Sequence, residues 1–332
     1  MSDGGKTVVV GTGAWGVAIA IQVAAHGRPV ALLARTCAEA AALHKSRHSP
    51  RHPAVPFPPL LDPTSDPVAA FTGADVVVLA VPAQTMRANL LAVARSIDPS
   101  AAIVVASKGL EVGTCLRMSE VVAEEAGGAA RILALSGPNL AAEVAAGMHA
   151  ASVVAGLDQD IARRVQARLG TPAWRLYLND DLVGVELGAA LKNVVAVAVG
   201  IADGLGHGEN ARAALVTRGL AEISRLAIRL GADARTLAGL AGLGDLVVTC
   251  ASPRSRNRQL GLRLAAGERL EAILATSGTV AEGVPTTHAA TEVARRAGVE
   301  MPIATVLARV FDGTIGVREA AAGLVGRAPG RE

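Results

Sequence analysis

Residues 7–16 read TVVVGTGAWG, a run of valines that leads directly into three closely spaced glycines. The apolar run predicts a strand buried on both faces, and the alanine-rich residues after it predict a helix. Gly11 would permit the tight turn, Gly13 would let a pyrophosphate approach the backbone, and Gly16 would let helix and strand pack closely. The motif therefore predicts a dinucleotide site at the helix N-terminus. The alternative is a tight strand–helix turn without a ligand.

The first half of the chain continues this alternation of short apolar strands and longer alanine-rich helices, which is typical of a doubly wound sheet. The predicted strands cover residues 7–10, 30–33, 76–81, 103–106, 132–136 and 152–155. The helices predicted between them include residues 16–25, 84–96 and 118–126. The proline-rich residues 50–67 interrupt the alternation and are predicted to form a surface loop with little regular structure.

From about Asp181 the valine runs disappear and long helical stretches take over. A change of pattern of this kind indicates a second domain of a different class. We expect an α/β N-terminal domain, residues 1–182, built on a Rossmann-type doubly wound sheet. We expect an all-α C-terminal domain over residues 183–332.

Composition excludes several classes of function. A net charge of +3 and only two Trp, one Tyr and three Phe in 332 residues argue against a nucleic-acid partner. Cys37, Cys115 and Cys250 lie far apart without a CxxC pair, which argues against disulfides and a metal site and favours a reducing compartment. The longest helical run free of polar residues, 194–202, is shorter than the ~20 residues of a membrane span. Glycines interrupt the N-terminal apolar run that could imitate a signal peptide.

The second predicted strand ends near Arg35, at the position where a dinucleotide fold contacts the adenosine ribose. A site specific for NAD usually places Asp or Glu here to accept from the ribose 2′-hydroxyl. An arginine suits a 2′-phosphate instead, so the sequence favours NADP(H) and leaves NAD(H) open. A solvated arginine at the end of a strand is the alternative interpretation.

Lys192 lies on a predicted helix among small apolar residues. Its helical neighbours include Gly188, Ala189, Val195 and Ala196, so the lysine would not face water. Burial lowers the pKa of a lysine towards the value that a proton donor and acceptor near neutrality requires. The alternative is a lysine whose ammonium reaches solvent from the edge of the helix.

A second polar cluster follows a glycine turn at residues 242–244. Asp245 is expected to be a helix N-cap or an acid of the site. A little further on come residues with forked donors, a hydroxyl and an amide, a set that suits a phosphate dianion. They are Arg254, Ser255, Arg256, Asn257 and Arg258. A solvated basic loop is the alternative interpretation.

These motifs together resemble the bacterial NAD(P)-dependent glycerol-3-phosphate dehydrogenase family. The resemblance runs in order from about residue 6 to 325, and its motifs are GTGAWG (11–16), SKGLE (107–111), SGPN (136–139), ELGAALKN (186–193), GLGDLVVTC (242–250), SRNR (255–258) and VAEG (280–283). It implies reversible reduction of dihydroxyacetone phosphate to sn-glycerol 3-phosphate, which supplies glycerophospholipid biosynthesis. It also implies a cytoplasmic homodimer and a phosphorylated triose as substrate.

The resemblance assigns roles by motif. Lys192 would be the catalytic proton donor and acceptor. The substrate would contact Lys108, Gly137, Asn139, Lys192, Asp245, Ser255, Arg256 and Asn257. The cofactor would contact Gly11, Gly13, Ala14, Trp15, Gly16, Arg35, His52, Lys108, Ala141, Arg256, Val280 and Glu282.

The chain departs from the family pattern at several positions. Asn139 stands where the family usually has Ser or Thr, although an amide can still donate to a substrate. Leu140 replaces an aromatic residue, Leu33 a Trp and His149 a Pro, and Thr36 replaces a second basic residue after Arg35. A hydroxy-acid or ketopantoate-type dehydrogenase is the alternative function, and a cofactor-sensing protein without turnover is a third.

Overall fold

The computed structural model describes residues 5–128, 131–276 and 281–325. The chain divides into two compact units. The first consists of Met1–Ser107 and Met118–Val185, and the second of Lys108–Arg117 and Glu186–Glu332. Both this division after Val185 and the boundary expected after residue 182 fall in the first turn of one helix.

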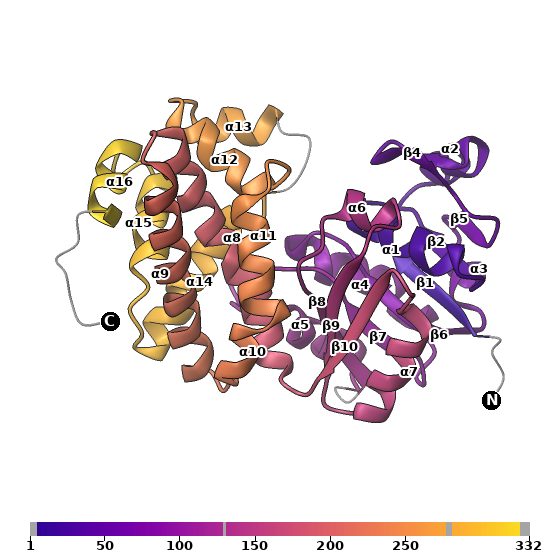
Figure 1. Cartoon of the computed structure of the whole chain (residues 1–332). Coiled ribbons are helices and arrows are strands. Elements are labelled where there is room, and N and C mark those ends of the chain that lie inside the picture. Colours follow the sequence, from indigo (N-terminus) through magenta and orange to yellow (C-terminus); the bar gives the residue numbers. More distant parts are fainter. Residues whose placement is uncertain (1–4, 129–130, 277–280, 326–332) are drawn as a thin grey trace. The chain divides into compact units, whose positions relative to one another are not determined.

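The first unit is an α/β unit around one large sheet (Figure 1). Its strands are β1 (Lys6–Val10), β2 (Val30–Leu33), β3 (His48–Ser49), β4 (His52–Pro56), β5 (Leu61–Thr64), β6 (Ala74–Leu79), β7 (Ala102–Val105), β8 (Ile132–Ser136), β9 (Ala150–Gly156) and β10 (Trp174–Asn179). Its helices are α1 (Ala14–Ala25), α2 (Cys37–Ser46), α3 (Pro67–Phe71), α4 (Met86–Val93), α5 (Met118–Ala126), α6 (Ala141–Ala145) and α7 (Gln159–Leu169).

The eight-stranded sheet has the order β10-β9-β8-β7-β6-β1-β2-β5. Six neighbouring strands, from β8 to β5, run parallel, and β9 pairs antiparallel with β8. The chain leaves β1 towards β2 on one side and later returns to β6 on the other. Ligands of doubly wound sheets bind at such a switch point, beyond the carboxyl ends of the strands. The glycine motif follows β1 and therefore lies there.

The prediction for the proline-rich residues 50–67 was wrong. Residues His52–Pro56 pair with β3 in a short antiparallel ribbon, and Leu61–Thr64 form an edge strand of the large sheet beside β2. Proline is tolerated on an edge strand because its missing N–H breaks no ladder on the open side. The prolines therefore mark a sheet edge and not an irregular loop.

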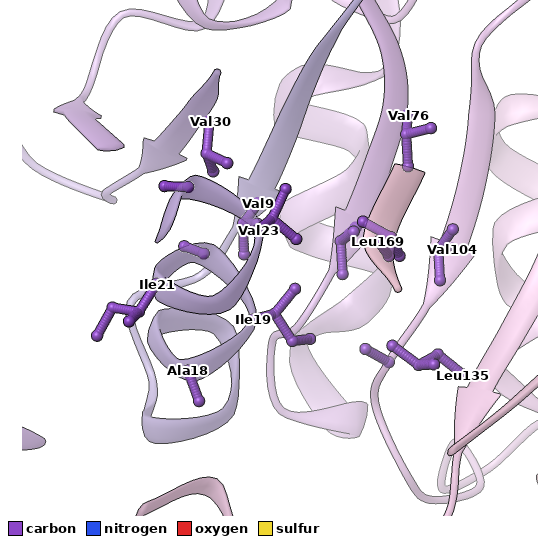
Figure 2. Packing of buried hydrophobic residues seen from close by; sticks show 14 of the residues in the cluster. Val9, Ala18, Ile19, Ile21, Val23, Val30, Val76, Val104, Leu135 and Leu169 are labelled. Atoms are coloured by element: carbon purple, nitrogen blue, oxygen red, sulfur yellow. The ribbon is translucent and has the colours of Figure 1, made fainter. Parts of the chain in front are cut away.

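The core of the first unit is aliphatic. Ile19 and Val23 of α1 lie beside Val9 of β1, and Val104 and Leu135 continue the same layer over the sheet (Figure 2). All five side chains are buried. Burial of each such side chain contributes about 1.5–3 kcal/mol, so this layer fixes where α1 begins and where its N-terminus points.

The second unit is built of helices, apart from the segment Lys108–Arg117. They are α8 (Leu182–Gly204), α9 (Gly208–Arg229), α10 (Ala234–Ala238), a π-helical turn (Leu240–Gly244), α11 (Asp245–Ala251), α12 (Arg256–Ala265), α13 (Leu270–Thr276), α14 (Gly283–Ala297), α15 (Pro302–Phe311) and α16 (Val317–Val325). The two units together confirm the predicted fold class, an α/β Rossmann-type unit followed by a helical one.

Helix α8 is the centre of the second unit. Among the described residues it alone is long and apolar enough to cross a membrane, and 89% of its apolar window is buried inside the protein. It is thus a core helix, and no membrane span is implied. Its neighbour α12 packs so closely that a Cβ at Gly200 would lie 2.1 Å from the carbonyl oxygen of Arg258, so glycine is required there. The buried Asp203 also accepts from Arg258 Nε at 2.8 Å, which fixes α12 against α8.

Candidate active site

The glycine turn after β1 has the shape that a dinucleotide phosphate requires. Gly11 has φ +112°, and a Cβ there would lie 2.8 Å from the carbonyl oxygen of Ala80. A Cβ at Gly16 would lie 2.2 Å from the carbonyl oxygen of Gly11. Gly13 differs, because a Cβ there would meet no described atom within 4 Å. Gly13 is also the N-cap of α1, so open space lies in front of free helix N–H groups, as an anion site needs.

The residues next to this turn are positioned by the first unit. Ala14 is exposed at the start of α1, and His52 Nε2 lies 2.7 Å from its carbonyl oxygen. Trp15 packs edge-on against Trp174, with ring centroids 5.6 Å apart. Ala141 begins α6 and is half-buried.

The end of β2 carries the exposed Arg35. Thr36 caps α2 by accepting from the backbone N–H of Glu39 at 3.2 Å. Glu39 was not predicted from the sequence, and its carboxylate accepts from Thr12 in the glycine turn at 2.5 Å. A cation and a carboxylate therefore both belong to this edge, which suits a 2′-phosphate and a 2′-hydroxyl respectively.

A short hairpin carries Lys108 into the second unit. Leu110 and Arg117 form an antiparallel bridge, and Glu111 N–H donates to the carbonyl of Leu116 at 2.9 Å. Arg117 Nη1 then donates to Glu186 Oε2 of α8 at 2.6 Å, and the carboxylate is buried. Removing one partner of a buried ion pair typically costs about 3–5 kcal/mol, because the other charge is left uncompensated, so the hairpin and α8 depend on each other here.

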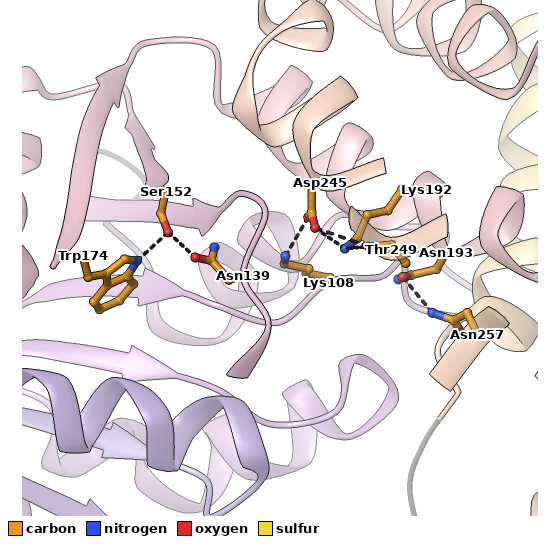
Figure 3. Close-up of polar contacts among 9 residues, drawn as sticks. All are labelled: Lys108, Asn139, Ser152, Trp174, Lys192, Asn193, Asp245, Thr249 and Asn257. Carbon is orange, nitrogen blue, oxygen red and sulfur yellow. Dashed lines mark hydrogen bonds and ion pairs between the residues drawn. The ribbon is translucent and has the colours of Figure 1, made fainter. Parts of the chain in front are cut away.

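Two lysines bind a single buried carboxylate (Figure 3). Asp245 begins α11, follows its N-cap Gly244 and is 1% exposed. Its Oδ2 accepts from Lys108 Nζ at 2.7 Å, and its Oδ1 accepts from Lys192 Nζ. Lys192 Nζ also donates to Thr249 Oγ1 at 2.7 Å, one helical turn after Asp245. Asp245 is thus not the helix cap, and its carboxylate binds the two lysines instead.

The surroundings of Lys192 lower its affinity for a proton. Burial in α8 lowers the pKa of Lys192 to about 8, even though the Asp245 carboxylate acts in the opposite direction, and Lys108 lowers the pKa further. Cys250 lies on the same helix as Asp245, and burial raises the pKa of its thiol to about 12. The cysteine therefore stays a thiol near neutrality, whereas a pKa of about 8 lets Lys192 exchange a proton there.

The start of α12 holds the predicted polar cluster, but its members have different tasks. Ser255 is the N-cap and accepts from the backbone N–H of Arg258 at 3.3 Å. Asn257 is buried, donates to Asn193 Oδ1 at 2.8 Å and accepts from the N–H of Gly283 at 2.9 Å. Arg256 is exposed in the first turn.

The expectation that Arg258 offers a forked donor to a phosphate is wrong. Its guanidinium pairs with the carboxylate of Asp203, which is itself 5% exposed and also accepts from Arg212. Among the other predicted residues, Glu282 is the N-cap of α14, and Val280 lies outside the described residues. Gly137 and Asn139 follow β8 in the first unit, where Asn139 Oδ1 accepts from Ser152 at 3.0 Å.

Several residues that contact the predicted site residues within each unit were not predicted from the sequence. Thr249 had a usable signal, because it lies four residues after Asp245 on a helix and therefore shares its face. Asn193 and Asp203 had none, since their partners lie more than fifty residues away along the chain. Ser152 and Trp174, which contact each other in the first unit, had none for the same kind of reason.

The lowered pKa of Lys192 predicts how stability depends on pH. Below pH 8 the ammonium is present in both the folded and unfolded chains, so the folded chain bears the cost of burying it. Between about pH 8 and 10.5 only the unfolded lysine keeps its proton, so the free energy of unfolding increases with pH. Relative to Lys192→Met, wild type should gain about 3 kcal/mol across this window. Urea unfolding of both proteins from pH 7 to 10.5 measures this difference, and a constant difference would contradict the lowered pKa.

Comparison with known families gives one answer for both units. The model of the N-terminal domain of NAD-dependent glycerol-3-phosphate dehydrogenase matches residues 6–162, and the model of its C-terminal domain matches residues 181–322. The chain is 49% identical over 312 residues to a glycerol-3-phosphate dehydrogenase (NAD(P)+) of Thermobifida fusca, with 93% of each chain covered. It is 48% identical over 316 residues to that of Streptomyces coelicolor, with 94% of each covered.

Solved structures agree. The crystal structure of glycerol-3-phosphate dehydrogenase from Coxiella burnetii superimposes with a TM-score of 0.92 at 34% identity, over 97% of this chain and 99% of that one. A ketopantoate reductase from Ralstonia eutropha reaches a TM-score of 0.58 at 16% identity, over 96% of this chain and 99% of that one, which is a likeness of fold alone. The chain therefore belongs to the NAD-dependent glycerol-3-phosphate dehydrogenase family.

Proposed function

We propose that this chain is an NAD(P)-dependent sn-glycerol-3-phosphate dehydrogenase that reversibly reduces dihydroxyacetone phosphate, with Lys192 as proton donor and acceptor. The observation that carries the proposal is the geometry of the Lys192 ammonium. Of its three N–H donors, one is directed to Asp245 and one to Thr249, and no other described residue accepts from it. The third donor is left for the oxygen of a substrate carbonyl.

Lys192 then acts as a general acid during reduction. Its proton passes to the oxygen at C2 as negative charge develops there, which leaves a neutral amine and an alcohol. A pKa of about 8 suits both directions, because the ammonium predominates at pH 7 and the amine is accessible slightly above it. Asp245 and Thr249 hold Nζ in place, so the proton starts from a fixed position.

The cofactor would be held by the first unit. When bound, a nicotinamide dinucleotide supplies or accepts the hydride at C2. Gly11, Gly13 and Gly16 shape the open space at the N-terminus of α1 that its pyrophosphate needs. Arg35 would bind the 2′-phosphate of NADP(H), and the carboxylate of Glu39 would accept from the 2′-hydroxyl of NAD(H).

The phosphate of the substrate would bind at the start of α12. The positive end of the helix dipole is present there, and the exposed Arg256 adds a cation with a forked set of donors. Asn257 and Asp203 do not need to touch substrate for this, because they fix α12 against α8 and α14. A cytoplasmic homodimer that supplies glycerophospholipid synthesis is part of the same proposal.

A steady-state assay tests the function directly. Wild type should oxidise NADPH or NADH when dihydroxyacetone phosphate is added, and Lys192→Met should fold, bind NADPH and lose turnover. Positioned general acids contribute ~10²–10⁴-fold, so kcat should drop by that factor. Methionine keeps the length of the side chain and removes the proton. Near-wild-type kcat in this variant would rule out Lys192 as the acid.

Arg35→Asp should shift cofactor preference from NADPH towards NADH. A carboxylate repels the 2′-phosphate and accepts from a 2′-hydroxyl, so kcat/KM for NADPH should drop about 10-fold or more. The two kcat/KM values, measured side by side, decide the question. If neither changes, Arg35 is a solvated residue without a role in cofactor choice.

Arg256→Ala should raise KM for dihydroxyacetone phosphate strongly and KM for NADPH less. A charge-assisted hydrogen bond is worth ~1.5–3 kcal/mol, so kcat/KM should drop roughly 10- to 150-fold. Unphosphorylated dihydroxyacetone is the control, since it has no phosphate contact to lose. Equal sensitivity of both substrates would mean that Arg256 acts through the cofactor or the fold, and the phosphate would have to be placed elsewhere.

A further inference from the structure

We propose that Ser152, itself held by Trp174, is a positioning residue that fixes the amide of Asn139, so that Asn139 Nδ2 donates to an oxygen of the substrate. This rests on the proposed function, because the oxygen that Asn139 would bind belongs to the proposed substrate. An amide has one accepting end and one donating end. Asn139 therefore binds a given ligand only if something decides which end faces it.

The direction of the hydrogen bonds decides the orientation (Figure 3). Trp174 Nε1 lies 2.7 Å from Ser152 Oγ, and an indole N–H can only donate. Ser152 Oγ therefore accepts from Trp174, and its own hydrogen is left to donate elsewhere. The acceptor within reach is the side-chain oxygen of Asn139, at 3.0 Å.

The opposite orientation of the amide leaves a buried polar hydrogen without a partner. Ser152 and Trp174 are both 0% exposed, so water cannot replace a missing acceptor. If Asn139 turned its Nδ2 towards Ser152, the serine hydrogen would have no acceptor among the described residues. An unpaired buried polar group costs about 1–3 kcal/mol, which selects the orientation with Oδ1 towards Ser152.

The other end of the amide is a donor in need of an acceptor. Asn139 Nδ2 is buried and has no hydrogen-bond partner among the described residues. The backbone next to it is held in an unusual form, because Gly137 has φ +143°. A Cβ at Gly137 would lie 2.9 Å from the carbonyl oxygen of Ala151 and 3.3 Å from Asn139 Nδ2. Glycine at 137 thus keeps the space beside this donor free.

These observations fit together as a prepared donor. An unsatisfied buried group in a native protein requires an explanation, and a ligand oxygen supplies one. A phosphorylated triose carries acceptor oxygens on its phosphate, ketone and hydroxyl groups. The indole, the hydroxyl and the amide form a chain in which each group orients the next, and the last N–H is directed to the ligand.

A double-mutant cycle tests the proposal on the full-length enzyme. The variants are Ser152→Ala, Asn139→Ala and the two combined, with KM for dihydroxyacetone phosphate, KM for NADPH and kcat measured for each. Ser152→Ala should raise KM for dihydroxyacetone phosphate about 3- to 10-fold, the effect of one neutral hydrogen bond. In the Asn139→Ala background the same substitution should change it less than 2-fold, because the amide it orients is gone.

Two further variants separate positioning from packing. Ser152→Thr keeps the hydroxyl and should restore most of the KM. Thr171→Val is the matched control, since Thr171 Oγ1 accepts from the backbone N–H of Trp174 at 2.9 Å and does not touch Asn139. It should lower Tm and leave KM for dihydroxyacetone phosphate unchanged.

The outcomes are distinct. The same KM increase from Ser152→Ala in both backgrounds, or an increase confined to NADPH, would overturn the positioning role while the proposed function stands. A wild-type chain without triose phosphate-dependent oxidation of NAD(P)H would overturn the proposed function and this proposal with it.

Discussion

The arrangement of the charged residues in the second unit depends on the carboxylate of Asp245. It accepts from two lysines, is almost fully buried, and lies at the start of a helix that also supplies Thr249. Two cations beside one anion leave an excess of positive charge, which suits an anionic substrate. The same cluster explains why Lys192 has a pKa of about 8, because burial and Lys108 together outweigh the attraction of one carboxylate. Removing that carboxylate would leave the buried ammonium of Lys192 beside a second, half-buried cation, Lys108, with no Asp245 charge to offset either.

The pairing with Asp245 involves a residue from a segment that the chain forms between two strands of the first unit. Lys108 follows β7 of the first unit, yet its hairpin belongs to the second unit through Arg117 and Glu186. Lys108 and Lys192 therefore both belong to the second unit, where they bind the same carboxylate. The first unit contributes a glycine turn with open space and an oriented Asn139, and both are fixed by buried packing within that unit.

Local sequence patterns were sufficient to predict the strand and helix around the glycine turn and the helix that carries Lys192. A valine run, three glycines and the small residues around Lys192 each express a short-range requirement of the fold. The partners of these residues could not be predicted, because the contact between Lys108 and Asp245 joins residues 137 positions apart. The strand around Pro63 was predicted as a loop for another reason, because a proline is compatible with a strand only at the edge of a sheet. The sequence also predicted that Arg258 binds a phosphate. Its guanidinium pairs with Asp203 instead, and that partner lies too far away along the chain to be predicted.

The central claim is that Asp245 and burial together set the proton affinity of Lys192 for catalysis. The most direct test is the pH dependence of kcat/KM for reduction of dihydroxyacetone phosphate, in wild type and in Asp245→Asn. Wild type should lose activity as pH rises through about 8, where Lys192 gives up its proton. In Asp245→Asn the break should move to lower pH, because the charge that favours the ammonium is gone. A break near the ordinary lysine value of 10.5, or one that is the same in both proteins, would contradict the account.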